Sequence, residues 1–190
     1  MHTDEGDVTM RAITGKYKGR HFDVPSSFNA RPTTDFAKEN LFNVLRSYVD
    51  FEGLHVLDLF AGTGSISLEF LSRGAERVVS VERDFKHYGF IRKVQDLLGN
   101  ASWRPLHLDA LRYIEKSEEP FSVVFADPPY ALRELGSLPE RVLGSKLLSD
   151  DGLFVLEHGR EYDFSDHLNY VEHRVYGSVN FTFFRKGKTS

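Results

Sequence analysis

The sequence predicts an α/β domain of the doubly wound type, with a mostly parallel sheet covered by helices. Short apolar runs alternate with segments of helical periodicity through most of the 190 residues. A Gly-x-Gly turn follows one of the central runs, and carboxylates follow four of them. The last two runs, 170–175 and 180–185, alternate apolar and polar residues around a Gly-Ser turn. They predict an antiparallel pair that completes the sheet.

The composition is that of one globular domain with a full core. The chain is 41% hydrophobic, and its net charge of -4 with a pI of about 6.1 argues against binding a polyanion over the whole surface. With no cysteine, it has no disulfide, thiolate zinc site or Cys nucleophile, and its scattered histidines predict no metal site. No apolar run reaches the length of a membrane span and no signal peptide is evident, so we expect a cytoplasmic protein.

The N-terminal region differs in charge from the rest of the chain. Residues 1–7 are polar and acidic, and we expect a disordered tail there, followed by one domain over residues 8–190. Runs 8–13 and 20–24 flank a Gly-bounded turn and predict a small β-hairpin. Between Val8 and Lys38 there are six basic and two acidic residues, interleaved with aromatic rings. Residues 8–34 are therefore expected to form a phosphate-contacting extension, with a solvated basic face as the alternative.

The elements of the main sheet follow in order. Thr33 or Thr34 is the expected N-cap of a helix whose buried face carries Ala37, Leu41, Val44, Leu45 and Tyr48. Strands are then predicted at 55–60, 77–81, 103–108, 121–126 and 153–157. Helices are predicted from about 65 to 73, from 85 to 99 with Asp84 as N-cap, from about 110 to 116, and over 134–144. A turn is expected at 150–152.

Strand-end carboxylates and glycines indicate a nucleoside-bearing cofactor. Asp58 precedes a turn with Gly62 and Gly64 that opens a helix, and Glu82 ends the next strand, where an acid commonly holds two ribose hydroxyls. Asp109 ends the third strand and is expected near an adenine, although it could simply cap the next helix. A tight turn without a ligand is the alternative interpretation of the glycines.

The spacing favours a cofactor without phosphate. Ser67 stands where the dinucleotide fingerprint requires a third glycine, and the Gly-Lys-Ser/Thr loop of nucleoside triphosphatases is absent. Asp58 would attract an ammonium group and repel a pyrophosphate. S-adenosylmethionine matches this description, with its amino-acid end near Asp58, Phe60 and the two glycines, its ribose on Glu82 and its adenine near Asp109.

The tetrapeptide Asp127-Pro128-Pro129-Tyr130 follows the strand at 121–126 and predicts the reacting centre. Ligands bind beyond the carboxyl ends of strands in open α/β sheets, and the prolines stiffen the loop. The Asp127 carboxylate and the Pro128 carbonyl could accept both N–H groups of an exocyclic amine, and Tyr130 could stack on its ring. The alternative for the tetrapeptide is a strand end that the prolines simply terminate, and the alternative for Tyr130 is an aromatic residue of the core.

These motifs resemble those of class I S-adenosylmethionine-dependent methyltransferases that modify exocyclic amines. With Met10 to Gly15, Gly19-Arg20, Arg31 to Asp35 and Leu41 to Asn43, the chain resembles the RsmD-like family of bacterial 16S rRNA guanine-N2 methyltransferases over roughly residues 8–188. The resemblance implies a Rossmann-like, seven-stranded sheet. The chain departs from the family pattern at 36–38, where a second arginine-rich turn is expected.

The resemblance also implies a function and a partner: methylation of the N2 amine of one guanine in 16S rRNA, within the 30S subunit or an assembly intermediate, by a monomer. Two alternatives stay open, an adenine-N6 methyltransferase acting on DNA or RNA and an inactive RNA-binding subunit with the same fold. The expected RNA-contacting residues are Arg11, Lys16, Lys18, Arg20, Arg31 and Thr34.

Overall fold

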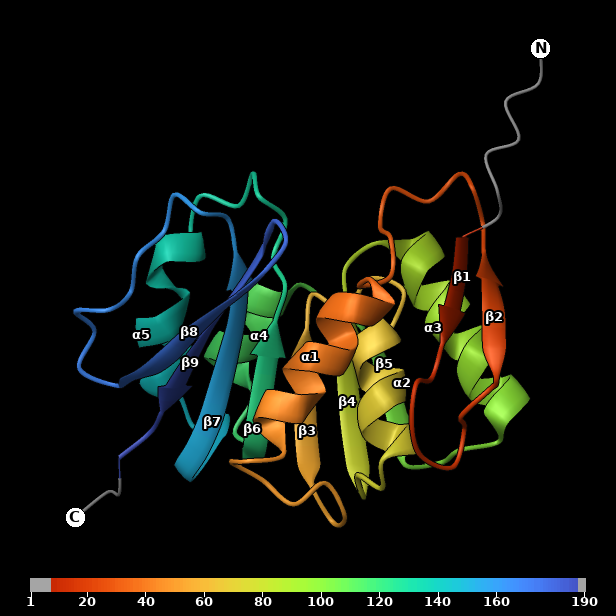
Figure 1. Ribbon diagram of the computed structural model, residues 1–190, viewed down its shortest axis with the longest axis horizontal. Helices are drawn as coiled ribbons and strands as arrows, with labels where there is room; N and C mark the ends of the chain where they lie inside the picture. The colour runs from red at the N-terminus through yellow and green to blue at the C-terminus, as the bar shows by residue number, and fades with distance from the viewer. Residues whose placement is uncertain (1–7, 188–190) are drawn as a thin grey trace.

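The computed structural model describes residues 8–187, so the predicted tail at 1–7 lies outside the described residues. It contains a two-stranded hairpin and a seven-stranded sheet (Figure 1). The strands are β1 (Val8–Arg11), β2 (His21–Val24), β3 (His55–Leu59), β4 (Arg77–Glu82), β5 (Trp103–His107), β6 (Phe121–Ala126), β7 (Leu148–His158), β8 (Tyr170–Tyr176) and β9 (Val179–Arg185). The helices are α1 (Asp35–Leu45), α2 (Ser65–Ser72), α3 (Phe85–Leu98), α4 (Ala110–Lys116) and α5 (Leu138–Leu143), with a 3₁₀ turn η1 (Leu135–Ser137).

The order of the strands confirms the doubly wound prediction. The large sheet runs β5-β4-β3-β6-β7-β9-β8, and the first five strands are parallel. β9 is antiparallel to both β7 and β8, which is the predicted antiparallel end. The chain winds outward from β3 in one direction and from β6 in the other. The point of reversal therefore lies between β3 and β6, where doubly wound sheets form a ligand crevice.

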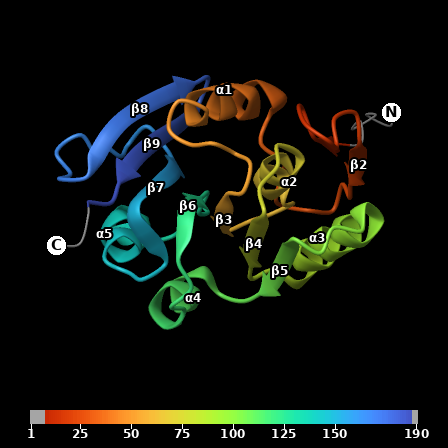
Figure 2. The same ribbon diagram turned by 90° about the horizontal axis from the view of Figure 1, so that it is seen from below.

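Helices cover both faces of the sheet (Figure 2). One core contains side chains of α1, α2 and α3 with alternate strand residues such as Val56, and the other contains those of α4 and α5 with the intervening residues such as Leu57. Successive strand residues point to opposite faces, and both faces are apolar, as expected for parallel strands buried on both sides. No helix within residues 8–187 has the length and hydropathy to cross a membrane.

The structure corrects three local predictions. The turn expected at 150–152 lies inside β7, where Asp151 adopts a positive φ of 60° and the pairing with β6 shifts register. The helix expected over 134–144 is divided into η1 and α5, because Pro139 has no N–H and suits the first turn of a new helix. Helix α1 ends at Leu45, so Tyr48 lies beyond it, although its ring still faces the sheet and stacks on Phe183 of β9.

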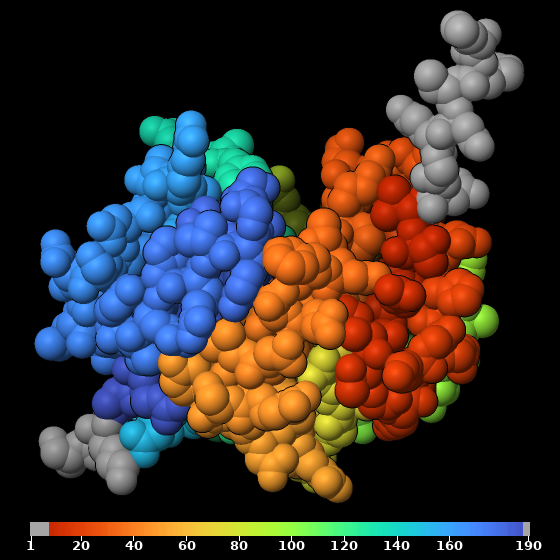
Figure 3. Space-filling model, in the orientation of Figure 1, coloured from red at the N-terminus to blue at the C-terminus, as the bar shows by residue number. Residues whose placement is uncertain are grey.

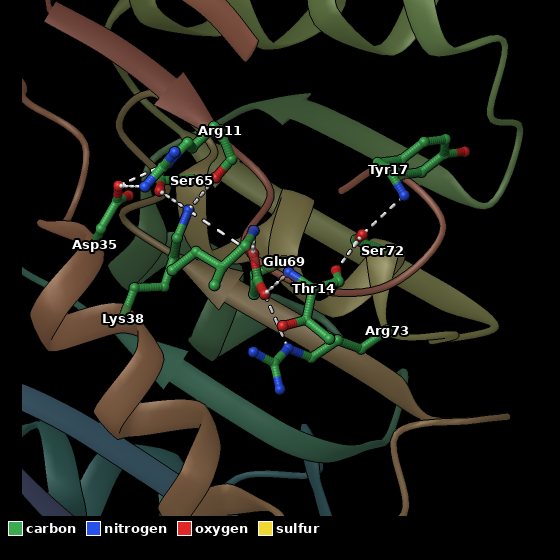
Figure 4. Close-up of polar contacts among 10 residues, drawn as sticks. Arg11, Thr14, Tyr17, Asp35, Lys38, Ser65, Glu69, Ser72 and Arg73 are labelled. Carbon is green, nitrogen blue, oxygen red and sulfur yellow. Dashed lines mark hydrogen bonds and ion pairs between the residues drawn. The ribbon is translucent and has the colours of Figure 1, made fainter. Parts of the chain in front are cut away.

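The departure at 36–38 places a lysine in the core. Lys38 is 1% exposed, and its ammonium donates to the Arg11 carbonyl at 2.6 Å and to Ser65 Oγ at 3.1 Å (Figure 4). Burial lowers the pKa of Lys38, and the buried carboxylate of Glu69, 3.9 Å away, opposes that shift. The side chain at position 38 therefore ties α1, the end of β1 and α2 together, and is not available to contact RNA.

Glu69 also holds the hairpin to α2. Its carboxylate accepts from the backbone N–H groups of Ile13 at 2.8 Å and Thr14 at 3.2 Å, and from Arg73 Nε at 2.9 Å (Figure 4). One turn further along α2, Ser72 Oγ accepts from the Tyr17 N–H and donates to the Thr14 carbonyl. The segment after β1 is thus fixed by polar contacts with one side of α2.

Glu69→Gln should destabilise the protein by about 3 kcal/mol, because it leaves the Lys38 ammonium buried without its counter-charge. Urea denaturation at pH 7 measures the change. Glu76→Gln is the matched control: Glu76 pairs with His55 on the surface, where its carboxyl side chain is 68% exposed, and its loss should change stability by less than about 0.5 kcal/mol. Equal effects of the two substitutions would contradict a structural role for the buried pair.

Candidate active site

The candidate site lies at the carboxyl ends of β3, β4, β5 and β6. Figure 3 shows a hollow at the corresponding upper edge of the molecule, between the orange segment that precedes α1 and the blue-green segments on the other side. Parallel strands bring their carboxyl ends to a single edge, so Asp58, Glu82, Asp109 and Asp127 are gathered there from four strands.

The glycine turn is shaped by backbone conformation and by packing. Gly62 and Gly64 have φ values of 59° and 81°, which residues other than glycine rarely adopt. A Cβ at Gly64 would also lie 3.0 Å from the Trp103 ring and 3.1 Å from Ile91. Phe60 itself has a φ of 58°, so the chain turns sharply as it leaves β3. The turn leads into the first turn of α2, where the Ser67 backbone N–H donates to the Asp58 carboxyl group.

Asp58 lies beneath this turn and is 1% exposed. Its carboxylate accepts from Ser67 Oγ at 2.6 Å, Ser67 contacts Ser80, and Trp103 Nε1 donates to Ser80 Oγ at 2.8 Å. Burial raises the pKa of Asp58 to about 7, and the charges of Asp127 and Glu82 add to the shift. The sequence analysis noted Ser67 only because it stands where a dinucleotide-binding motif would have a third glycine. In the structure its hydroxyl fixes the Asp58 side chain. The position of Ser67, three residues after Gly64 in the first turn of α2, could have indicated this role.

Glu82 connects the ends of β3 and β4. Its two carboxylate oxygens accept from the Gly62 N–H at 2.8 Å and the Asp84 N–H at 2.9 Å. Asp84 caps α3 as predicted, accepting from the N–H groups of Lys86 and His87. A carboxylate has about four acceptor positions, so Glu82 keeps capacity for two hydroxyl donors.

Asp109 is the N-cap of α4 and accepts from the Arg112 N–H at 3.1 Å. The structure therefore confirms the helix-capping role that the sequence analysis gave as the alternative for Asp109. A cavity of about 600 Å³ opens beside it, lined by Arg83, His107, Leu108 and residues of α4. Asp109 is thus both a structural cap and a polar group on the wall of a cavity next to the strand ends.

The Asp127 loop begins where β6 ends. Pro128 is buried, the Pro129 carbonyl accepts from the Leu132 N–H at 2.9 Å, and the Tyr130 ring is 70% exposed. Tyr130 is therefore not a core aromatic, and its ring is free to contact a ligand.

Glu157, which the sequence reasoning did not select, lies beside Asp127. Ala126 of β6 pairs with Leu156 of β7, so the next residues of the two strands are neighbours. Asp127 is exposed as a residue, but protein crowds its carboxyl group. This desolvation and a hydrogen bond with the Glu157 carboxyl raise the pKa of Asp127 well above its usual range. The signal was available, because Glu157 ends the predicted strand 153–157 as the other carboxylates end theirs.

Three of the predicted RNA-contacting residues lie near the site and have structural partners. Arg11 forms an ion pair with Asp35 at 2.7 Å. Arg31 donates to the backbone carbonyls of Phe28, Ala30 and Ser26, which shapes the loop before α1. Thr34 is the N-cap of α1, its Oγ1 accepting from the Ala37 N–H at 3.3 Å.

Lys16 and Lys18 belong to a turn at the opposite end of α2, whereas Arg20 lies beside the end of β1, where its carbonyl accepts from the Ala12 N–H. The Lys16 N–H bonds to the carbonyl of Ser72, the last residue of α2, whereas the glycine turn lies at its first residue. Eight helical residues separate the two by roughly 12 Å. Lys16, Lys18 and Arg20 are exposed, and within residues 8–187 none of them forms an ion pair with a carboxylate. The predicted set is therefore divided between the region near the strand ends and the turn of the hairpin.

Known proteins resemble the chain over nearly its whole length. Residues 10–185 match the family model described as "Conserved hypothetical protein 95". The chain is 35% identical over 184 residues to "Putative rRNA methyltransferase YlbH" of Bacillus subtilis, covering 93% of this chain and 99% of that protein. It is 34% identical over 151 residues to "Ribosomal RNA small subunit methyltransferase D" of Escherichia coli, covering 80% and 71%. The solved structure "Putative methyltransferase yhhF from Escherichia coli" superposes with a TM-score of 0.81 at 27% identity, covering 94% and 98%.

Asp58→Asn should change how stability depends on pH. The folded-state pKa of about 7 is above the ordinary value of 3.8, so between these values the folded protein holds a proton that the unfolded chain releases. Asp58 should therefore make wild-type stability fall as pH rises from about 4 to 7, by at most about 4 kcal/mol, and the variant should lack this contribution while keeping that of Asp127. Urea denaturation from pH 4.5 to 8 measures it. The exposed Asp166→Asn control should follow wild type, and parallel curves for Asp58→Asn and wild type would contradict the burial of an ionisable group there.

Proposed function

The chain belongs to the RsmD family of ribosomal RNA methyltransferases, and we propose that it methylates the N2 amine of one guanine in 16S rRNA, using S-adenosylmethionine. The carrying observation is the position of the Asp127-Pro128-Pro129-Tyr130 loop at the end of β6, next to the glycine turn at the end of β3, across the reversal point of the sheet. A particle of the small ribosomal subunit is the proposed partner, since its relatives are named for small-subunit rRNA.

The residues present fit this cofactor. Gly62 and Gly64 leave no side chain over the turn, Glu82 keeps acceptors for two ribose hydroxyls, and a cavity opens beside Asp109. Asp58 lies beneath the turn and supplies a negative field there; an ammonium above it would favour its ionised form. The chemistry that the cofactor supplies when bound is an electrophilic methyl group on a positively charged sulfur.

The chain's own residues then hold and polarise the amine. Asp127 and the Pro128 carbonyl would accept its two N–H bonds, which aims the nitrogen lone pair out of the base plane. The carboxylate would also stabilise the positive charge that develops on nitrogen. Tyr130, with its exposed ring, would stack on a base that has left the RNA structure. Adenine-N6 methylation would use the same loop, and family membership favours guanine over it.

Methyl transfer to 30S particles that lack the modification tests the proposal, with nucleoside analysis and mapping of the product. We expect N2-methylguanine at one position. N6-methyladenine as the product would favour the alternative enzyme, and no methyl incorporation would favour the inactive subunit.

Asp127→Ala should lower the single-turnover rate by roughly 100-fold or more, the scale of losing one preorganised transition-state partner. Asp127→Asn should be milder, because its amide oxygen still accepts a hydrogen bond. Cofactor affinity, measured by calorimetry, should barely move in either variant, since Asp58, Glu82 and Asp109 are left intact. Full activity of Asp127→Ala would remove this loop from the mechanism.

Replacing Lys16, Lys18 and Arg20 together by Ala should weaken RNA binding and reduce its salt dependence by up to about three units of slope. Their distance from the strand ends predicts a normal single-turnover rate at saturating RNA. Filter binding at several salt concentrations measures the slope. The matched control is the triple replacement of Lys86, Lys93 and Lys116, which lie on α3 and α4. A salt dependence and an affinity unchanged from wild type would make the hairpin turn a solvated face only.

A further inference from the structure

Glu157 is a buried acid without a basic partner at the edge where the proposed reaction takes place. It is 9% exposed and occupies the next-to-last position of β7, opposite Phe181 of β9. Glu157 interacts electrostatically with the Asp127 carboxyl and the Tyr130 phenol. No basic side chain within residues 8–187 forms an ion pair with it. A buried carboxyl group without a counter-ion is costly, so a purely structural role does not account for it.

The sheet directs Asp127 and Glu157 to one face. Residues in register share a face in a parallel sheet, and Ala126 and Leu156 are paired and both contribute to the core beneath α4 and α5. The next residues, Asp127 and Glu157, therefore point to the other face, which is the face covered by α1 and α2. Asp58 points to that same face, since it pairs with Phe125. The two carboxyl groups thus lie side by side on that face.

We propose that Glu157 is a specificity-determining residue that accepts the N1–H of the target guanine while Asp127 accepts from the N2 amine. This inference rests on the proposed function and names how its substrate base is selected. The Watson–Crick edge of guanine presents N1–H and the N2 amine as adjacent donors, whereas adenine presents an acceptor at N1. Two neighbouring carboxyl groups match the first pattern and repel the second.

The same pairing explains why the acids are tolerated next to each other. In the free protein a proton on Asp127 relieves the repulsion between the two groups, in agreement with the raised pKa of Asp127. The donors of a bound guanine would replace that proton as the group that bridges the carboxylates. The adjacent ends of β6 and β7 therefore account both for the proposed recognition of the base and for the electrostatic interaction of Asp127 with Glu157 in the free protein.

A base analogue separates recognition of N1 from the chemistry at N2. The purine 2,6-diaminopurine keeps the N2 amine but has an acceptor at N1. The experiment uses 30S particles reconstituted with 16S rRNA that carries either guanine or 2,6-diaminopurine at the mapped target position. Single-turnover rates and apparent affinities are measured for wild type, Glu157→Gln and Glu161→Gln.

Wild type should prefer guanine by at least about 100-fold, because a site built to accept a hydrogen bond rejects an analogue that lacks the donor. Glu157→Gln introduces an amide that can accept or donate, so this variant should reduce the preference to within about tenfold. Glu161→Gln is the matched control: Glu161 is exposed and also faces Tyr130 electrostatically, and its replacement should leave the preference unchanged. Glu157→Asp, which keeps the carboxyl group, should retain a preference for guanine.

An unchanged guanine preference in Glu157→Gln, with cofactor affinity intact, would overturn the inference. So would wild-type protein that methylates 2,6-diaminopurine as fast as guanine. Either result leaves guanine-N2 methylation itself standing. Methylation of adenine N6 by wild type would instead overturn the proposed function, and the two failures are therefore distinguishable.

Discussion

The crowding of carboxyl groups at one edge of the sheet is the constraint on which the site depends. Parallel strands end together, and in this chain β3, β4, β6 and β7 end in or near Asp58, Glu82, Asp127 and Glu157. Each group has different partners: Asp58 accepts from the Ser67 hydroxyl, Glu82 accepts from two backbone N–H groups, and Asp127 and Glu157 bond to each other. The result is an acidic edge suited to neutral donors and to a cationic ligand.

A buried ion pair on the face of the sheet that α1 and α2 cover holds the elements next to this edge in place. Lys38 and Glu69 fix α1, α2 and the segment after β1 relative to each other. The loop before α1 is consequently held beside the glycine turn, where Ala30 lies 3.6 Å from the position of a Gly62 Cβ. The loop after the hairpin therefore lies beside the glycine turn, whereas the turn within the hairpin places Lys16 and Lys18 at the other end of α2.

That separation bears on how a structured RNA would bind. Contacts at the strand ends can select and orient a base, whereas the distant basic turn can contact only phosphates elsewhere on the RNA. A particle-sized substrate can reach both surfaces at once. Affinity and base selection would then depend on different parts of the chain, the turn between β1 and β2 and the ends of β6 and β7.

The sequence by itself determined the doubly wound architecture, the order of its elements and most of the strand-end carboxylates. These follow from local signals: apolar runs that predict strands, glycines that predict a turn, and caps such as Thr34 and Asp84 whose hydrogen bonds span three residues. Only the tertiary structure decided which polar groups meet. Lys38 resembles a solvated basic residue in the sequence but is buried because Glu69 and Ser65 face it from α2. Glu157 is an acid at the end of one more strand until β7 is placed beside β6. Lateral strand order and the pairing of buried charges are long-range properties, since they depend on which segments neighbour each other across the sheet, and no local pattern in the chain encodes them.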